Sequence, residues 1–178
     1  MPAIFKTVAW QVDQLVAGVQ QGSISLPDLQ RPFVWPATKV RDLFDSMYRG
    51  YPVGTLMFWD VPEEGSSHAI AATAEITAAH QIVDGQQRLT SLYAAMKGLS
   101  VQDDNYRQKS IKIAFHPFTE RFEVATAATA RSPEWIGDIA EVSALPTMPK
   151  MISSMVSTTQ VANSTKRRSA PCALSSVT

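Results

Sequence analysis

Residues 82–90 read Ile-Val-Asp-Gly-Gln-Gln-Arg-Leu-Thr, and this stretch decides the fold around it. The apolar run from His80 to Val83 has the character of a β-strand, and the Asp-Gly pair that follows marks a tight turn. Beyond the turn, apolar residues recur at helical spacing on one face: Leu89, Leu92, Tyr93 and Met96. The stretch therefore predicts a strand, a tight turn and a helix in direct succession.

The residues of this turn suit an anion. Gly85 permits a positive φ or a close backbone approach, and the start of a helix points N–H groups at a ligand. Arg88 offers a planar, permanently charged fork that matches phosphate, and Asp84 could hold a magnesium ion or orient a water molecule. Gln86 and Gln87 can donate and accept hydrogen bonds to base, ribose or phosphate oxygens. The same pattern is also that of an ordinary structural turn with a solvated arginine.

A second polar cluster lies far upstream. Residues 27–36 read Pro-Asp-Leu-Gln-Arg-Pro-Phe-Val-Trp-Pro, and the three prolines stiffen this segment and exclude a long helix. Gln30, Arg31 and Trp35 could form a binding platform on it. Alternatively the segment is a plain connection whose aromatic side chains fill the core. We favour the core role for Phe33, and both roles stay open for Trp35.

Composition bounds the class of protein. The chain has 178 residues, of which 45% are hydrophobic and 18% charged, as in an ordinary globular domain with a real core. The part up to Glu141 carries 12 basic against 16 acidic residues, a net charge of −4, and so lacks the basic character of an autonomous DNA-binding domain. The single cysteine, Cys172, excludes a disulfide framework, and neither a signal peptide nor a membrane span is recognisable. We expect a cytoplasmic protein.

Further helices and strands follow from periodicity and from the positions of glycine and proline. Together they predict an α+β fold. The expected elements are a helix from Val8 to Gln21, a strand from Ile24 to Leu26, a helix from Pro36 to Gly50, a central strand from Thr55 to Trp59, a hairpin of Ile111–His116 with Arg121–Ala125, and a helix starting at Ser132.

The other candidate ligands are weak. His68 and His80 have no partner at metal-ligand spacing, so each is more readily a surface or core histidine. Asp103 and Asp104 could bind a cation, but adjacent acids in a polar turn are usually only solvated.

The sequence changes character at Ser143. From there to Thr178 about a third of the residues are Ser or Thr, acids are absent, and one basic run, residues 166–168, stands alone. This composition predicts a disordered tail, residues 143–178, behind a folded domain, residues 1–142. A different hypothesis is that a frameshift or misplaced gene end produced an unselected sequence here.

The two polar clusters together resemble a known family. Residues 26–35 look like the opening motif of the N-terminal domain of GmrSD-type restriction endonucleases. Residues 50–56 match its continuation, and residues 83–90 match its signature block. The resemblance covers roughly Val8 to Val142, and two long motifs in the right order make it specific.

The resemblance implies a ParB/sulfiredoxin-like α+β fold, a small mixed sheet with packed helices. It places the signature arginine, Arg88, at a helix start beside bound phosphate. Family members hydrolyse nucleoside triphosphates with a divalent metal, here Mg²⁺, and couple this to cleavage of modified phage DNA, including glucosylated hydroxymethylcytosine DNA. The implied nucleotide site comprises Asp84, Gln86, Gln87 and Arg88, with Gln30, Arg31 and Trp35 lining its other side.

The departures from the family limit this expectation. The three histidines, His68, His80 and His116, do not form the His-Asn-His nuclease module, so DNA cleavage would need a separate domain or chain. Sulfiredoxin chemistry would need a cysteine where glutamines stand. The family's helical continuation after residue 142 is also missing, which raises the interpretation of a truncated copy.

We therefore expect a nucleotide-binding NTPase domain of a DNA restriction system. The alternatives are a nucleotide switch or DNA-backbone-binding module without turnover, and an inactive remnant. The expected catalytic residues are Asp84, also the candidate metal ligand, and Arg88; the expected nucleotide-binding residues are Gln30, Arg31, Trp35, Gly85, Gln86 and Gln87.

Overall fold

The computed structural model describes residues 5–26, 32–60, 79–143 and 159–164. The helices are α1 (Val12–Gln20), α2 (Ala37–Tyr48), α3 (Gln86–Lys97), α4 (Ala127–Arg131) and α5 (Ile139–Ser143). The strands are β1 (Phe5–Trp10), β2 (Ile24–Ser25), β3 (Leu56–Asp60), β4 (His80–Asp84), β5 (Ser100–Gln102), β6 (Gln108–Ser110), β7 (Ile113–His116), β8 (Arg121–Val124) and β9 (Thr159–Ser164). Over the described ranges, no helix is long and apolar enough to cross a bilayer.

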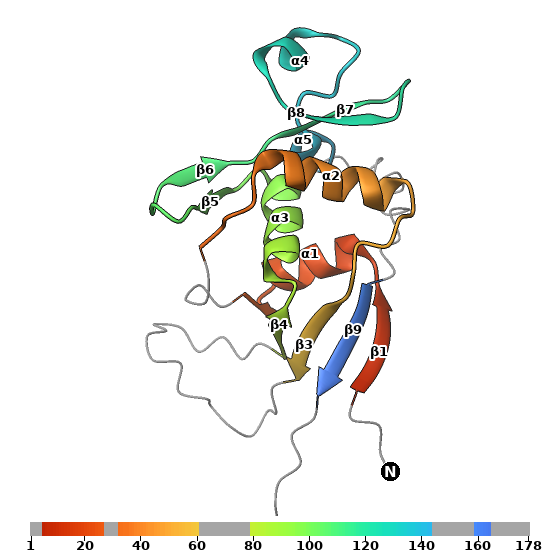
Figure 1. The fold of residues 1–178 in the computed structure, drawn as a ribbon, viewed down its shortest axis with the longest axis vertical. Coiled ribbons are helices and arrows are strands. Elements are labelled where there is room, and N and C mark those ends of the chain that lie inside the picture. The colour runs from red at the N-terminus through yellow and green to blue at the C-terminus, as the bar shows by residue number, and fades with distance from the viewer. Residues whose placement is uncertain (1–4, 27–31, 61–78, 144–158, 165–178) are drawn as a thin grey trace, which may run out of the picture.

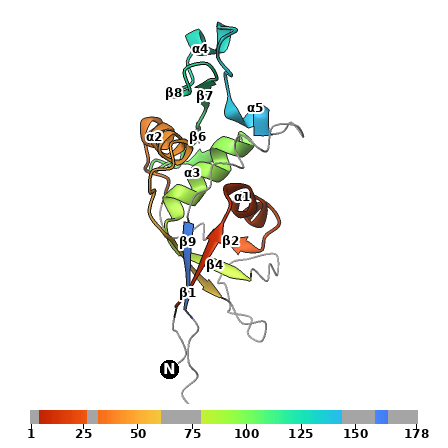
Figure 2. The ribbon, with the colours of Figure 1, turned by 90° about the vertical axis from the view of Figure 1, so that its right-hand side faces the viewer.

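One mixed sheet and two hairpins organise the molecule. The sheet has the strand order β1-β9-β3-β4-β2, in which β3 runs antiparallel to β4 and β2 runs parallel to it. β5 pairs with β6 and β7 pairs with β8 as separate antiparallel hairpins. Figures 1 and 2 show α3 between the sheet on one side and α2 with the β7–β8 hairpin on the other.

The helix α3 contributes to two hydrophobic cores. The sheet core lies between the strands and helices α1 and α3; it comprises Leu15, Ile24, Leu56, Phe58, Ile82 and Leu89. The helical core lies where α2 and α3 meet the β7–β8 hairpin; its members include Val40, Phe44, Leu92, Met96, Phe115 and Phe122. Because α3 carries residues of both cores, its position and that of the turn before it are fixed from two sides.

The predicted strand, turn and helix at residues 80–97 are confirmed. Ile82 is the buried member of β4, while its neighbours Gln81 and Val83 are exposed, as the alternation of a strand covered on one face requires. Gly85 bends the chain with φ of +88°, and Gly98 ends α3 with φ of +65°. The α+β class, the helix after Pro36, the central strand and the β7–β8 hairpin are confirmed as well.

Two predicted helix starts are wrong, although the rest of the helix expected from Val8 to Gln21 is confirmed as α1. Residues 8–10 belong to β1, because Thr7 and Ala9 are exposed while Val8 and Trp10 are half-buried, which is the alternation of a strand. Ser132 does not start a helix; its carbonyl accepts a hydrogen bond from the Trp135 N–H at 3.2 Å and so closes a turn.

The helix nearest Ser132 begins earlier. α4 starts after Thr126, whose side chain accepts from the Thr129 N–H at 3.3 Å while the Thr129 hydroxyl accepts from the Thr126 N–H at 2.8 Å. These two hydrogen bonds form a capping box, and the threonines three residues apart are the sequence signal for the start of α4.

The stretch expected to be a disordered tail contains one described element. Residues 159–164 form β9, which pairs antiparallel with β1 and parallel with β3, so the expectation does not hold for these six residues. The rest of the expected tail, residues 144–158 and 165–178, lies outside the described residues, as do Gln30, Arg31 and His68.

Candidate functional site

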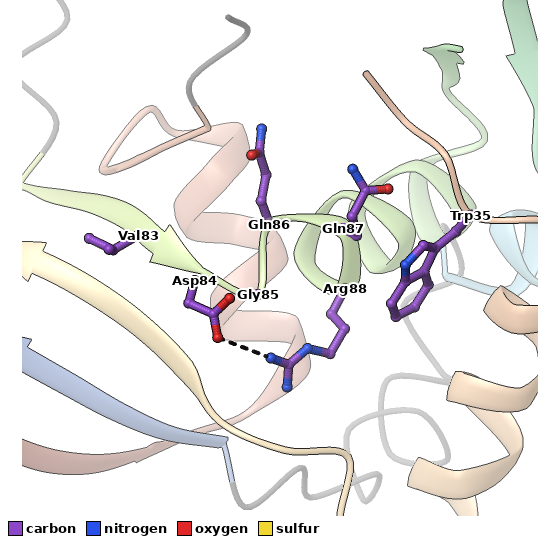
Figure 3. A pocket seen from close by; sticks show the side chains of 7 residues that line it. All are labelled: Trp35, Val83, Asp84, Gly85, Gln86, Gln87 and Arg88. Atoms are coloured by element: carbon purple, nitrogen blue, oxygen red, sulfur yellow. Dashed lines mark ion pairs between the residues drawn. The ribbon is translucent and has the colours of Figure 1, made fainter. Parts of the chain in front are cut away.

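A pocket lies around the first turn of α3. It has a volume of about 330 Å³ and is lined by seven residues: Trp35, Val83, Asp84, Gly85, Gln86, Gln87 and Arg88 (Figure 3). Six of them are consecutive in the sequence, and only Trp35 comes from another segment, the chain that leads into α2. The structure thus brings Trp35 to the signature turn, as expected from the sequence.

The positive end of α3 faces this pocket. The hydrogen-bond ladder of the helix begins with the Leu89 N–H donating to Gly85 O at 3.1 Å, so the N–H groups of the first turn lie ahead of it. Gly85 has no side chain with which to cap them, and the first turn of α3 contains no acidic residue. The aligned peptide dipoles therefore favour a negative charge at this position.

Arg88 is held in place by two neighbouring segments. Its Nη1 donates to Val53 O at 2.8 Å, and its Nη2 lies 3.7 Å from Asp84 Oδ2. The Arg88 side chain is 20% exposed, whereas the Asp84 side chain is 73% exposed. In Figure 3 the guanidinium points toward Asp84 on one side, and Trp35 stands on the other. A guanidinium fixed in this way is preorganised to meet an anion, because it loses little conformational freedom on binding.

Two glycines make room for this guanidinium. Gly54 and Gly85 both have φ of +88°. A Cβ placed on Gly54 would lie 2.5 Å from Arg88 Nη1, and one placed on Gly85 would overlap Leu56 Cδ2 and lie 3.2 Å from Arg88 Nη2. The sequence analysis singled out Gly85 but not Gly54. The signal that could have found Gly54 is its place in residues 50–56, which match the same family as the separate block that carries Arg88.

The Gln87 side chain is engaged with the segment before α2. Its Oε1 accepts from the Val34 N–H at 3.1 Å, and its Nε2 donates to Pro32 O at 3.0 Å. The amide thereby joins two parts of the chain more than fifty residues apart. In Figure 3 the side chains of Gln86 and Gln87 extend away from the Asp84–Arg88 pair.

The structure places Phe33 and Trp35 differently. Phe33 is 5% exposed and belongs to the helical core, which confirms its core role. Trp35 packs against the helical core and also lines the pocket, so its binding role stays a prediction. Two lysines that sequence reasoning missed adjoin it. Lys39 Nζ lies 4.3 Å from the centre of the Trp35 ring, and Lys109 Nζ donates to Trp35 O at 3.3 Å.

A preformed metal centre is not found in the described part of the chain, where no three His, Cys, Asp or Glu side chains converge. Asp84 is the carboxylate that lines the pocket. Asp103 instead organises the β5–β6 turn, because its Oδ1 accepts from the N–H groups of Asn105 at 2.9 Å and Arg107 at 2.8 Å. His80 pairs with Asp60 through Nδ1 and Oδ1, 2.7 Å apart, at the opposite end of β4 from the pocket.

The sequence of the chain is similar to those of known proteins. The chain is 30% identical to the uncharacterized protein MJ0686 of Methanocaldococcus jannaschii over an alignment of 95 residues, which covers 46% of this chain. The match spans 16% of that protein, so the chain corresponds to a small part of this relative. A family model, described as the N-terminal domain of GmrSD restriction endonuclease, matches residues 12–143 and therefore contains the whole pocket. The chain belongs to the family of GmrSD restriction endonuclease N-terminal domains.

Proposed function

We propose that this domain binds a nucleoside triphosphate at the α3 N-terminus and hydrolyses it with Mg²⁺ as part of a DNA restriction system. The observation that carries the proposal is the seat of Arg88. A guanidinium fixed by Val53 O and Asp84 stands beside the positive end of α3, inside a pocket walled by an indole. Fixed donors around a transferring phosphoryl group are the main source of rate in such reactions.

The residues divide the work by their chemistry. Arg88 and the first-turn N–H groups of α3 would hold the phosphate oxygens, since Arg88 and residues 85–87 line the same pocket. Asp84 would position the metal or the attacking water, because its carboxylate is largely exposed and lies next to the guanidinium.

The metal would depend on the nucleotide. Mg²⁺ is commonly held by one or two carboxylates together with substrate phosphates and water. Asp84 alone supplies too few ligands, so phosphate oxygens would complete the coordination shell. Mg²⁺ is therefore expected to bind measurably only when the triphosphate is present.

The test is calorimetric titration of Arg88→Ala with each triphosphate in the presence of Mg²⁺. Loss of a charge-assisted contact of about 1.5–3 kcal/mol should weaken binding by about tenfold or more. Arg121→Ala is the matched control, because Arg121 lies on β8 with 65% of its side chain exposed. Unchanged affinity in Arg88→Ala would remove Arg88 from the proposed site.

A second candidate is binding without turnover. It is favoured by the single carboxylate that lines the pocket, which is a sparse provision for a catalytic metal. The same arginine and helix terminus would then bind a nucleotide as a switch, or a phosphate of the DNA backbone. Steady-state phosphate release, measured with and without DNA, distinguishes the two. Turnover supports the hydrolase, and tight nucleotide binding with no release supports the switch.

The wider context follows from the family. We propose that nucleotide turnover here is coupled to cleavage of modified DNA by a nuclease in a separate domain or chain. The described residues contribute His80 and His116 as their histidines, and each has a structural neighbour. His80 pairs with Asp60, and the His116 Nδ1 accepts from the Thr119 N–H at 3.3 Å. This supports placing the nuclease elsewhere.

A further inference from the structure

We infer that Gln87 is a positioning residue, whose amide clamps the segment before α2 and so holds Trp35 as a stacking platform for the nucleobase. This rests on the proposed function, because it assigns the base-binding half of the same pocket. It differs from the expectation drawn from the sequence, in which Gln87 is itself one of the nucleotide-binding residues.

The first step of the argument is the geometry of the clamp. The two halves of the Gln87 amide meet partners of opposite kind, the Val34 N–H and Pro32 O. A flipped amide would set donor against donor and acceptor against acceptor, so the orientation is determined by the backbone. The side chain thus imitates one rung of a β-ladder, and it fixes the two residues that flank Phe33.

The second step is that the segment held by Gln87 leads directly into Trp35, the residue after Val34. Phe33 N–H donates to Gln102 O at 3.0 Å, which ties the same segment to the β5–β6 hairpin from the other side. Lys109 holds the Trp35 carbonyl, and Lys39 lies against the Trp35 ring. The indole is therefore fixed at its backbone and on its ring, and it remains a wall of the pocket.

The third step is the chemistry that such a wall selects. Arg88 and the start of α3 provide for the phosphates, whereas an indole offers no charge and a broad π-surface. Aromatic side chains bind bases by stacking, with little preference among them. The geometry thus assigns Trp35 to the base and predicts weak discrimination between purine triphosphates by this contact.

One experiment separates base binding from phosphate binding. Affinities for a nucleoside triphosphate and for inorganic tripolyphosphate, which has no base, are measured on the wild-type protein, Trp35→Leu, Gln87→Ala and Gln87→Glu. In Trp35→Leu and Gln87→Ala, loss of stacking should weaken triphosphate binding by about fivefold or more while tripolyphosphate binding stays unchanged. In Gln87→Glu the added negative charge should weaken binding of both anions, so this variant is used for the spectroscopic readout below. Gln87→Glu keeps the size and one acceptor but loses the donor to Pro32 O. Gln20→Ala, at an exposed position on α1, is the control.

A second readout follows the clamp without any nucleotide. The chain has four tryptophans, so 5-fluorotryptophan labelling gives four ¹⁹F resonances, and Trp35→Phe identifies the Trp35 signal by its loss. In Gln87→Ala and Gln87→Glu the Trp35 resonance should shift and broaden. Its chemical shift should also differ more between H₂O and D₂O, because the ring is more exposed to solvent, while the other three resonances stay in place.

Three outcomes would overturn the inference. An unchanged Trp35 resonance in both Gln87 variants would refute the clamp. Equal losses of triphosphate and tripolyphosphate affinity in Gln87→Ala would make Gln87 a phosphate ligand instead. If the wild-type protein bound neither anion, both the base-stacking role of Trp35 and the proposed function would be refuted. The ¹⁹F spectra would still show independently whether Gln87 holds Trp35 in place.

Discussion

Arg88 sits in a slot that two left-handed glycines leave open, and this dependence can be tested at a single atom. A methyl group on Gly54 would lie 2.5 Å from Arg88 Nη1, so the guanidinium would have to leave Val53 O. Gly54→Ala should therefore weaken triphosphate binding about as strongly as Arg88→Ala, in addition to a backbone strain of about 1–2 kcal/mol.

Gly50→Ala supplies the matched control. Gly50 also has a positive φ, +71°, but a Cβ there would meet nothing within 4 Å. Both variants should thus lose similar stability in thermal melts, while only Gly54→Ala loses affinity in calorimetry. Equal affinities in the two variants would mean that Arg88 is not held by the Gly54 turn.

At the scale of single elements, α3 is the part on which both cores depend. Leu89 and Leu92 are 0% and 4% exposed, the first in the sheet core and the second in the helical core. Because both side chains are enclosed, Leu89→Ala and Leu92→Ala should each lower the free energy of unfolding by about 2–5 kcal/mol. Urea denaturation at constant m-value measures this.

The exposed end of the same helix gives the comparison. Lys97 lies in the last turn of α3, so Lys97→Ala should cost less than about 1 kcal/mol, chiefly through the helix dipole. If Leu89→Ala lowered the free energy of unfolding no more than Lys97→Ala, the packing of α3 against the sheet core would contribute little to stability. It would then not be what fixes the turn before α3 in place.

At the scale of the whole molecule, the sheet extends beyond the part that defines the family. The family match covers residues 12–143, which include β2, β3 and β4, whereas β1 and β9 lie outside it. β1 meets the sheet through β9, since the two are neighbours in the strand order and pair over residues 5–10 and 159–164. Loss of β9 should therefore also release β1 from the sheet.

Removal of residues 144–178 tests this arrangement. The shortened chain should lose hydrogen-exchange protection at the amides of β1, because its strand partner is gone, while α3 stays protected. Two results together would contradict the pairing of β9 with β1 and favour an unselected tail. One is rapid proteolysis of residues 159–164 in the full chain; the other is equal protection of the β1 amides in the full and the shortened chain. A broad, non-cooperative melt of either chain would favour the inactive remnant.

Local sequence determined a definable share of this protein. Residues 80–98 carry their own strand alternation, a glycine for the turn and a glycine for the helix end, and the helix after Pro36 is equally self-contained. These signals lie within a few residues of the atoms they direct. The pocket's position at the start of α3 followed from them.

Only the tertiary structure decided the rest, because the deciding contacts are distant in sequence. Residues 8–10 became a strand since β9, some 150 residues later, pairs with them. Gln87 carries no local sign that its amide meets Pro32 and Val34, and Gly54 none that Arg88 fills the space a side chain would need. Spacing along the chain shows which hydrogen-bonding and charged groups lie near the turn; only the packing of distant segments determines which of them line the pocket.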